Sequence, residues 1–127
     1  MNIVELVGRI FLSALFLIEG VGKIFTQEQV VMYMEEYNVP GMFFIPAVVV
    51  EIVFPLLLIV GYKTRLSALG MTLFTLTVTI IFHTDFNDGM QLIFFLKNLA
   101  IAGGFMIIFA YGPNKFSLDR YLESKKE

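Results

Sequence analysis

The stretch GMQLIFFLKNLAIAGGFMIIFAYG, residues 89–112, decides the fold class of this chain. An α-helix rises about 1.5 Å per residue, so about 20 apolar residues cross a hydrocarbon core of about 30 Å. Lys97 lies inside this stretch, where an unpaired ammonium group costs about 2.5 to 3.5 kcal/mol on insertion scales. Another segment must therefore supply a partner for Lys97, and the adjacent Asn98 adds a second polar group.

The composition of the whole chain agrees with a protein of the lipid bilayer. Of its 127 residues, 57% are hydrophobic, which is well above the value of about 45 to 50% for soluble domains. The length fits one domain over residues 1–127, and a net charge of -2 argues against a nucleic-acid partner. The chain has no cysteine, which excludes disulfides, thiol redox chemistry and metal sites built on cysteine.

Three further apolar stretches predict an all-α fold, a four-helix transmembrane bundle. In the first span, Glu5 with Arg9 and Glu19 with Lys23 have the i,i+4 spacing at which opposite charges pair on a helix. The expected spans are about 3–25, 42–60, 66–83 and 90–111, followed by a tail over 112–127.

The segment TQEQVVMYMEEY, residues 26–37, predicts a short amphipathic helix at the membrane interface between spans one and two. Thr26 and Gln29 have the spacing of a capping box, which favours a helix start at this point. Pro40 and Gly41 then favour a turn before the second span.

The basic residues of the loops predict the orientation. Both termini and the turn at 61–65 fall on one side of a four-span bundle, and that side holds nearly all of the loop Lys and Arg residues: Lys63, Arg65, Lys115, Arg120, Lys125 and Lys126. The positive-inside rule therefore places both termini in the cytoplasm, and we expect the cytoplasmic membrane of a bacterium or archaeon.

Ionisable residues of three spans fall at similar depth. At about 1.5 Å per residue from the outer ends, Glu19 lies about 9 Å deep, Lys97 about 12 Å and Glu51 about 13 Å. We expect one internal ligand-binding cluster formed by Glu19, Lys23, Glu51, His83, Lys97 and Asn98. A purely structural role stays open, because buried charges also fix the register of membrane helices. A metal site is not expected, because the chain has one histidine and a lysine would repel a cation.

A series of short motifs runs in order along most of the chain. They are Gly8-Arg9, Gly20 to Lys23, Glu51, Gly61 with Arg65, His83, Lys97-Asn98, Gly103-Gly104, Gly112-Pro113 and Ser117-Leu118-Asp119. With these motifs the chain resembles the DoxX family of small four-span membrane proteins. The resemblance implies a four-helix membrane bundle and a link to quinone-dependent redox chemistry, because such relatives include a subunit of thiosulfate:quinone oxidoreductase. It does not imply that this chain is an enzyme, and no catalytic residue is assigned.

Three functions are consistent with these features. In the first, the chain is a subunit of a quinone-linked redox system that binds a quinone or a small anionic substrate. Lys97 and His83 would donate hydrogen bonds to its oxygens, and Glu51 or Glu19 would relay protons. In the second, it is a non-enzymatic assembly or interaction protein whose buried charges only specify helix packing. The expected partners are the lipid bilayer, other membrane redox subunits or a further copy of the chain. The third is a small proton-coupled carrier, which would need a dimer to form an inverted repeat.

Overall fold

The computed structural model describes residues 2–126, and every regular element within them is a helix. The all-α prediction is thus confirmed, and the four long helices begin and end within about two residues of the expected bounds. The elements are α1 (Asn2–Phe25), α2 (Gln27–Glu36), the 3-10 helix η1 (Gly41–Phe43), α3 (Phe44–Val60), α4 (Thr64–Phe82), α5 (Gly89–Tyr111) and α6 (Leu118–Lys126).

Three segments within residues 2–126 are long and apolar enough to cross a membrane. They are Gly41–Val60, Thr64–Phe82 and Gly89–Tyr111. The fourth long helix, α1, has 24 residues but carries four charged side chains, Glu5, Arg9, Glu19 and Lys23. Its composition alone therefore does not mark it as a span.

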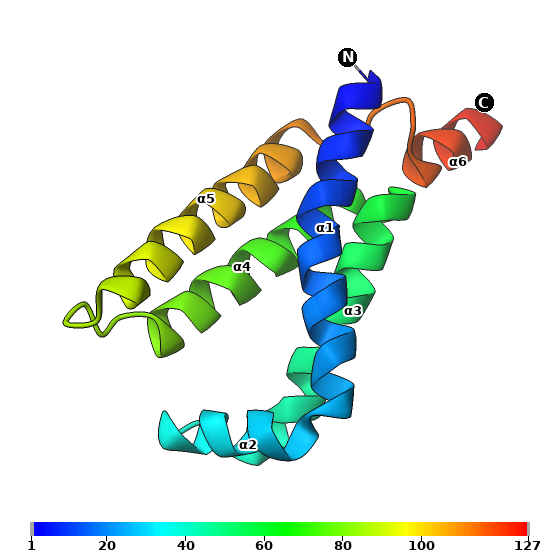
Figure 1. The fold of residues 1–127 in the computed structure, drawn as a ribbon. Coiled ribbons are helices and arrows are strands. Elements are labelled where there is room, and N and C mark those ends of the chain that lie inside the picture. Colours follow the sequence, from blue (N-terminus) through cyan, green and yellow to red (C-terminus); the bar gives the residue numbers. More distant parts are fainter. Residues whose placement is uncertain (1, 127) are drawn as a thin grey trace.

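The long helices form two antiparallel pairs (Figure 1). α1 packs along α3, and α4 packs along α5. The pairs meet at the end of the molecule where both termini lie, and they diverge toward the other end, where α2 runs from the foot of α1 toward the end of α4. We call these the closed end and the open end.

Two apolar clusters hold this arrangement together. The larger one joins both pairs near the closed end and contains Phe16, Leu58, Ala68, Met71, Phe105 and Ile108. The smaller one, Met34, Phe44 and Val48, fixes α2 against α3. Between the pairs, the ring of Phe54 lies where a side chain on Gly70 would otherwise project, so the glycine allows α3 and α4 to approach closely.

Arg9 organises the closed end. Its guanidinium is 1% exposed and forms an ion pair of 2.9 Å with Glu5, which confirms the predicted i,i+4 pair. It also donates to the carbonyl oxygen of Leu58 at 2.7 Å and to that of Phe116. One side chain of α1 thus joins the end of α3 to the segment before α6.

At the open end the start of α2 differs from the prediction. Thr26 does not cap α2 with its side chain, and its hydroxyl donates instead to the carbonyl of Gly22 at 3.1 Å. The capping-box expectation is wrong because α1 continues to Phe25 and leaves a hydrogen-bonded turn between the two helices. Asp88 does cap α5, accepting from the N–H of Met90 at 3.0 Å.

Candidate functional site

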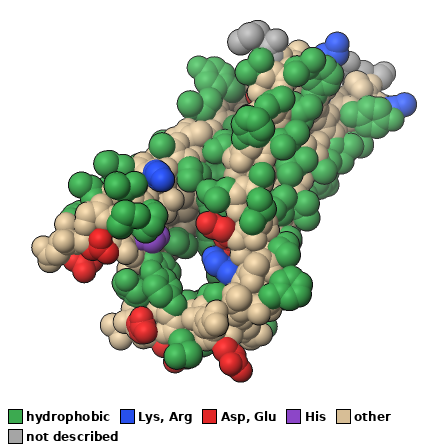
Figure 2. Space-filling view, viewed as in Figure 1, with side chains coloured by type: hydrophobic (Ala, Val, Ile, Leu, Met, Phe, Trp, Pro, Cys, Tyr) green, Lys and Arg blue, Asp and Glu red, His purple; other side chains and the backbone are tan. Residues whose placement is uncertain are grey.

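The divergence of the two pairs leaves a cavity of about 1000 Å³ at the open end. Side chains of α1, α2, α3, α4 and α5 line it, and Figure 2 shows an opening that passes through the molecule in this region. Most of the wall is apolar, with six phenylalanines among the lining residues: Phe16, Phe43, Phe44, Phe74, Phe82 and Phe94. The cavity therefore suits a ligand that is itself largely apolar.

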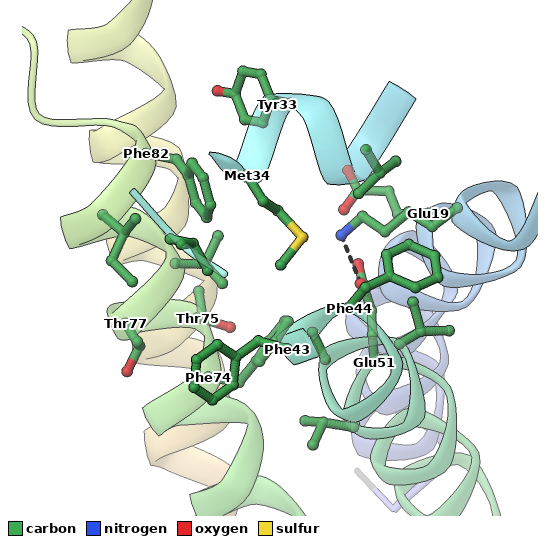
Figure 3. A pocket seen from close by; sticks show the side chains of 18 of the residues that line it. Glu19, Tyr33, Met34, Phe43, Phe44, Glu51, Phe74, Thr75, Thr77 and Phe82 are labelled. Carbon is green, nitrogen blue, oxygen red and sulfur yellow. Dashed lines mark hydrogen bonds and ion pairs between the residues drawn. The ribbon is translucent and has the colours of Figure 1, made fainter. Parts of the chain in front are cut away.

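The main polar feature of the wall is an ion pair between Lys23 and Glu51 (Figure 3). Lys23 Nζ lies 2.7 Å from Glu51 Oε2, and the Glu51 side chain is only 1% exposed whereas that of Lys23 is 32% exposed. α1 and α3 come close here because Gly20 packs against Glu51 without a side chain of its own. Glu19 lies beside this pair, near enough for its carboxylate to interact with that of Glu51.

This pairing corrects two expectations. Lys23 was expected to pair with Glu19 along α1, and Lys97 was expected to join the cluster, but the side chain that reaches Glu51 belongs to Lys23. Lys97 is exposed on α5 and is not part of the cavity wall. The depth of Lys97 along its helix followed from residue counting, but the direction of its side chain around the helix axis did not.

Asn98 and His83 do reach the cavity, from α5 and from the end of α4. His83 Nδ1 lies 3.0 Å from Oε1 of Gln91, and its ring centroid is 5.5 Å from that of Phe94. The sequence-based prediction missed Gln91 as the partner of His83. The only sequence signal for it was a polar side chain in the first turn of an otherwise apolar helix.

The structure therefore brings five of the six expected residues to one cavity, with Lys97 outside it. They are Glu19, Lys23, Glu51, His83 and Asn98. Whether these residues bind a ligand remains a prediction.

The floor of the cavity comes from α2, which the prediction treated as an interfacial helix without a role in the site. Tyr33 and Met34 line it, and the Tyr33 ring stacks on Phe82 of α4 at 5.3 Å between centroids. Burial raises the pKa of Tyr33 to about 12, and the neighbouring Tyr37 and Glu36 act in the same direction. The Tyr33 hydroxyl therefore stays protonated at neutral pH.

Three threonines of α4 differ in how their hydroxyl groups are satisfied. Thr72 and Thr79 donate to carbonyls of their own helix, those of Ala68 at 2.8 Å and Thr75 at 2.6 Å. Thr75 lines the cavity and is 2% exposed, yet its hydroxyl has no hydrogen-bond partner within residues 2–126. A buried hydroxyl without a partner is unfavourable, so the Thr75 side chain would gain a hydrogen bond by turning toward a ligand in the cavity.

Comparisons with known proteins indicate a membrane protein. Two inner membrane proteins of Escherichia coli (strain K12) are similar to this chain. YqjF is 40% identical over 121 residues, covering 94% of this chain and 92% of its own. YphA is 34% identical over 122 residues, covering 91% and 87%. No solved structure gives a significant match. The sequence model of the DoxX family matches residues 4–84, which span α1 to α4, and the chain therefore belongs to the DoxX family.

Proposed function

We propose that this chain is a four-span inner membrane protein whose cavity binds a quinone for a quinone-linked redox system. The similarity to two inner membrane proteins supports the location. The largely apolar cavity carries the assignment of the ligand, together with the unsatisfied hydroxyl of Thr75 behind its wall. The proposal includes a redox partner subunit that exchanges electrons with the quinone. The residues at the cavity of this chain supply hydrogen bonds and protons.

Two observations support α1 as the fourth span. Its outward residues are apolar, with Phe11 72% and Ile18 73% exposed, as expected of a helix that faces lipid. Its two basic side chains are paired, Arg9 with Glu5 and Lys23 with Glu51, which reduces the cost of placing them in a membrane.

The distribution of charge supports the proposed orientation. The closed end carries both termini and the basic turn at 61–65, so the positive-inside rule assigns it to the cytoplasm. The open end then faces the periplasm, and α2 lies across it as an interfacial helix with Met34 packed inward.

The charges at the cavity favour a neutral ligand over a small anion. Two carboxylates, Glu19 and Glu51, stand beside one ammonium group, that of Lys23, and their sum repels a further negative charge. A quinone is neutral, and its isoprenoid chain matches the phenylalanine wall. Its carbonyl oxygens accept hydrogen bonds, which the Thr75 hydroxyl and the Asn98 amide supply, and Glu19 accepts a proton when a quinol is oxidised.

The test is quinone retention after purification in mild detergent, measured by solvent extraction and mass spectrometry. Thr75→Val removes the hydroxyl at nearly constant shape, and one lost hydrogen bond of about 1 kcal/mol corresponds to a roughly fivefold loss of affinity. Thr72→Val is the matched control, because the Thr72 hydroxyl bonds its own helix and lies off the cavity.

The proposal predicts a lower quinone content for Thr75→Val and an unchanged content for Thr72→Val. Wild-type protein without quinone would overturn it and leave the assembly role as the better account. Equal retention in both variants would show that Thr75 does not hold the ligand.

A further inference from the structure

A stripe of side chains on α1 faces α5. Leu12, Phe16 and Glu19 follow one another at i, i+4 and i+7, and therefore share one side of the helix. The first two contact α5 directly. Leu12 lies 3.1 Å from the position that a side chain on Gly104 would take, and the ring centroids of Phe16 and Phe105 are 5.7 Å apart.

A matching stripe on α5 faces α1. Gly104, Ile101 and Lys97 lie on one side of α5, and Ile101 packs against the core cluster that contains Phe16. Because α1 and α5 run in opposite directions, moving two turns toward the open end from the contact between Leu12 and Gly104 leads to Glu19 on one helix and to Lys97 on the other (Figure 1). Each move covers about 10.5 Å along its own helix, so Glu19 and Lys97 lie equally far from that contact.

At this depth the two helices have separated. Glu19 and Lys97 are both exposed, and no ion pair within residues 2–126 includes either of them. The cavity wall includes Leu15 and Glu19 from α1 and Phe94 and Asn98 from α5, so the cavity reaches the space between these two helices. An acid on α1 and a base on α5 thus stand at this side of the cavity.

We propose that the gap between α1 and α5 is a lateral portal through which a membrane-dissolved ligand enters, and that Glu19 and Lys97 close it by forming an ion pair. The ligand class rests on the proposed function above, whereas the closure rests on the positions of the two side chains alone. Closure also balances the charges of the site. Lys23 remains with Glu51, Glu19 joins Lys97, and no carboxylate is left over.

Paired cysteines test the closure, and the natural chain contains no cysteine that would interfere. The double variant Glu19→Cys/Lys97→Cys is treated in native membranes with oxidant or with a short bis-maleimide. Glu19→Cys/Leu99→Cys is the control, since Leu99 is also exposed but lies about 200° further around α5. We expect the first pair to crosslink at least tenfold faster than the control. Equal rates, or no crosslink in either, would overturn the closure.

The same samples test the passage of ligand. A disulfide between the two positions is expected to slow the exchange of bound quinone for added deuterated quinone at least tenfold, and reduction is expected to restore it. Unchanged exchange in fully crosslinked protein would overturn the portal. Absence of quinone from wild-type protein would instead refute the proposed function, and the crosslinking rates would still report on the closure.

Charge variants provide a second measurement that does not need a crosslink. Lys97→Glu places two carboxylates across the gap and is expected to speed quinone exchange several-fold. The swapped variant Glu19→Lys/Lys97→Glu restores opposite charges and is expected to return exchange toward the wild-type rate. A swap that behaves like the single variant would show that the two residues do not act on each other.

Discussion

The Asp119 carboxylate accepts hydrogen bonds from both the backbone N–H and the hydroxyl of Thr64, at 2.8 and 2.7 Å. It also accepts from the N–H of Lys63 at 2.8 Å, while the N–H of Asp119 donates to the carbonyl of Gly61. A side chain from α6 therefore caps the start of α4, where the free N–H groups and the helix dipole both favour a negative charge.

Removing this negative charge should destabilise the closed end. Asp119→Asn keeps the size of the side chain but weakens hydrogen bonds made to a charged acceptor, and we expect a loss of about 1 to 3 kcal/mol in unfolding free energy. Thermal unfolding in detergent, followed by circular dichroism, measures the change. Glu123→Gln is the control, because the ion pair of Glu123 with Arg120 is exposed and should contribute less than about 1 kcal/mol. Equal losses of unfolding free energy in Asp119→Asn and Glu123→Gln would contradict the role of Asp119 as a cap of α4.

The stability of the protein should depend on pH through the same residue. Burial opposes ionisation of Asp119, but the hydrogen bonds from Thr64 and Lys63 outweigh it and lower the pKa below its ordinary value of 3.8. Because the folded pKa lies below the unfolded one, the stabilisation is complete above about pH 5 and is lost as the pH falls through the folded value. The difference in stability between wild type and Asp119→Asn should therefore shrink in acid. A difference that stays constant to pH 2 would exclude the linkage.

A glycine at the same end should tolerate no side chain. Gly61 has a φ of +80°, and a methyl group there would meet Ser117 and the Arg9 guanidinium. Gly61→Ala should cost more than about 1 kcal/mol, since strain and overlap add. Gly22→Ala, within α1 and with no atom near the added methyl, should be neutral or stabilising by up to about 1 kcal/mol. Thermal unfolding in detergent measures the stability of both variants. A large loss of stability in Gly22→Ala would contradict the explanation by strain and overlap at Gly61.

Removing one partner of the ion pair between Lys23 and Glu51 should lower the unfolding free energy more than removing both partners. Lys23→Met leaves the buried carboxylate of Glu51 without a partner, and we expect a loss of up to about 3 kcal/mol. The double variant Lys23→Met/Glu51→Leu removes both charges and should recover part of that loss. Lys97→Met serves as the comparison, because it also removes a lysine charge but leaves the Glu51 carboxylate paired with Lys23. Additive losses in the double variant would argue against the pair.

Hydropathy and residue spacing predicted the helices well, because an apolar run of membrane length has few alternatives to a helix. They also predicted correctly that Glu19, Glu51 and Asn98 lie in one region. They did not identify the partner of Glu51, because the choice between Lys23 and Lys97 depends on how α1 and α5 are rotated about their axes. The motifs Gly8-Arg9, Gly61 and Ser117 to Asp119 were read as family features, and the structure shows why they occur together. They meet at the closed end, in contacts between segments far apart in sequence.

Arg9 joins the chain's beginning to a carbonyl acceptor 107 positions later. In the proposed four-span topology, the first helix enters the bilayer with its guanidinium only partly satisfied, because the Phe116 acceptor emerges from the ribosome after all of the long helices. Until then, the nascent chain depends on water, lipid headgroups or the insertion machinery to solvate that charge.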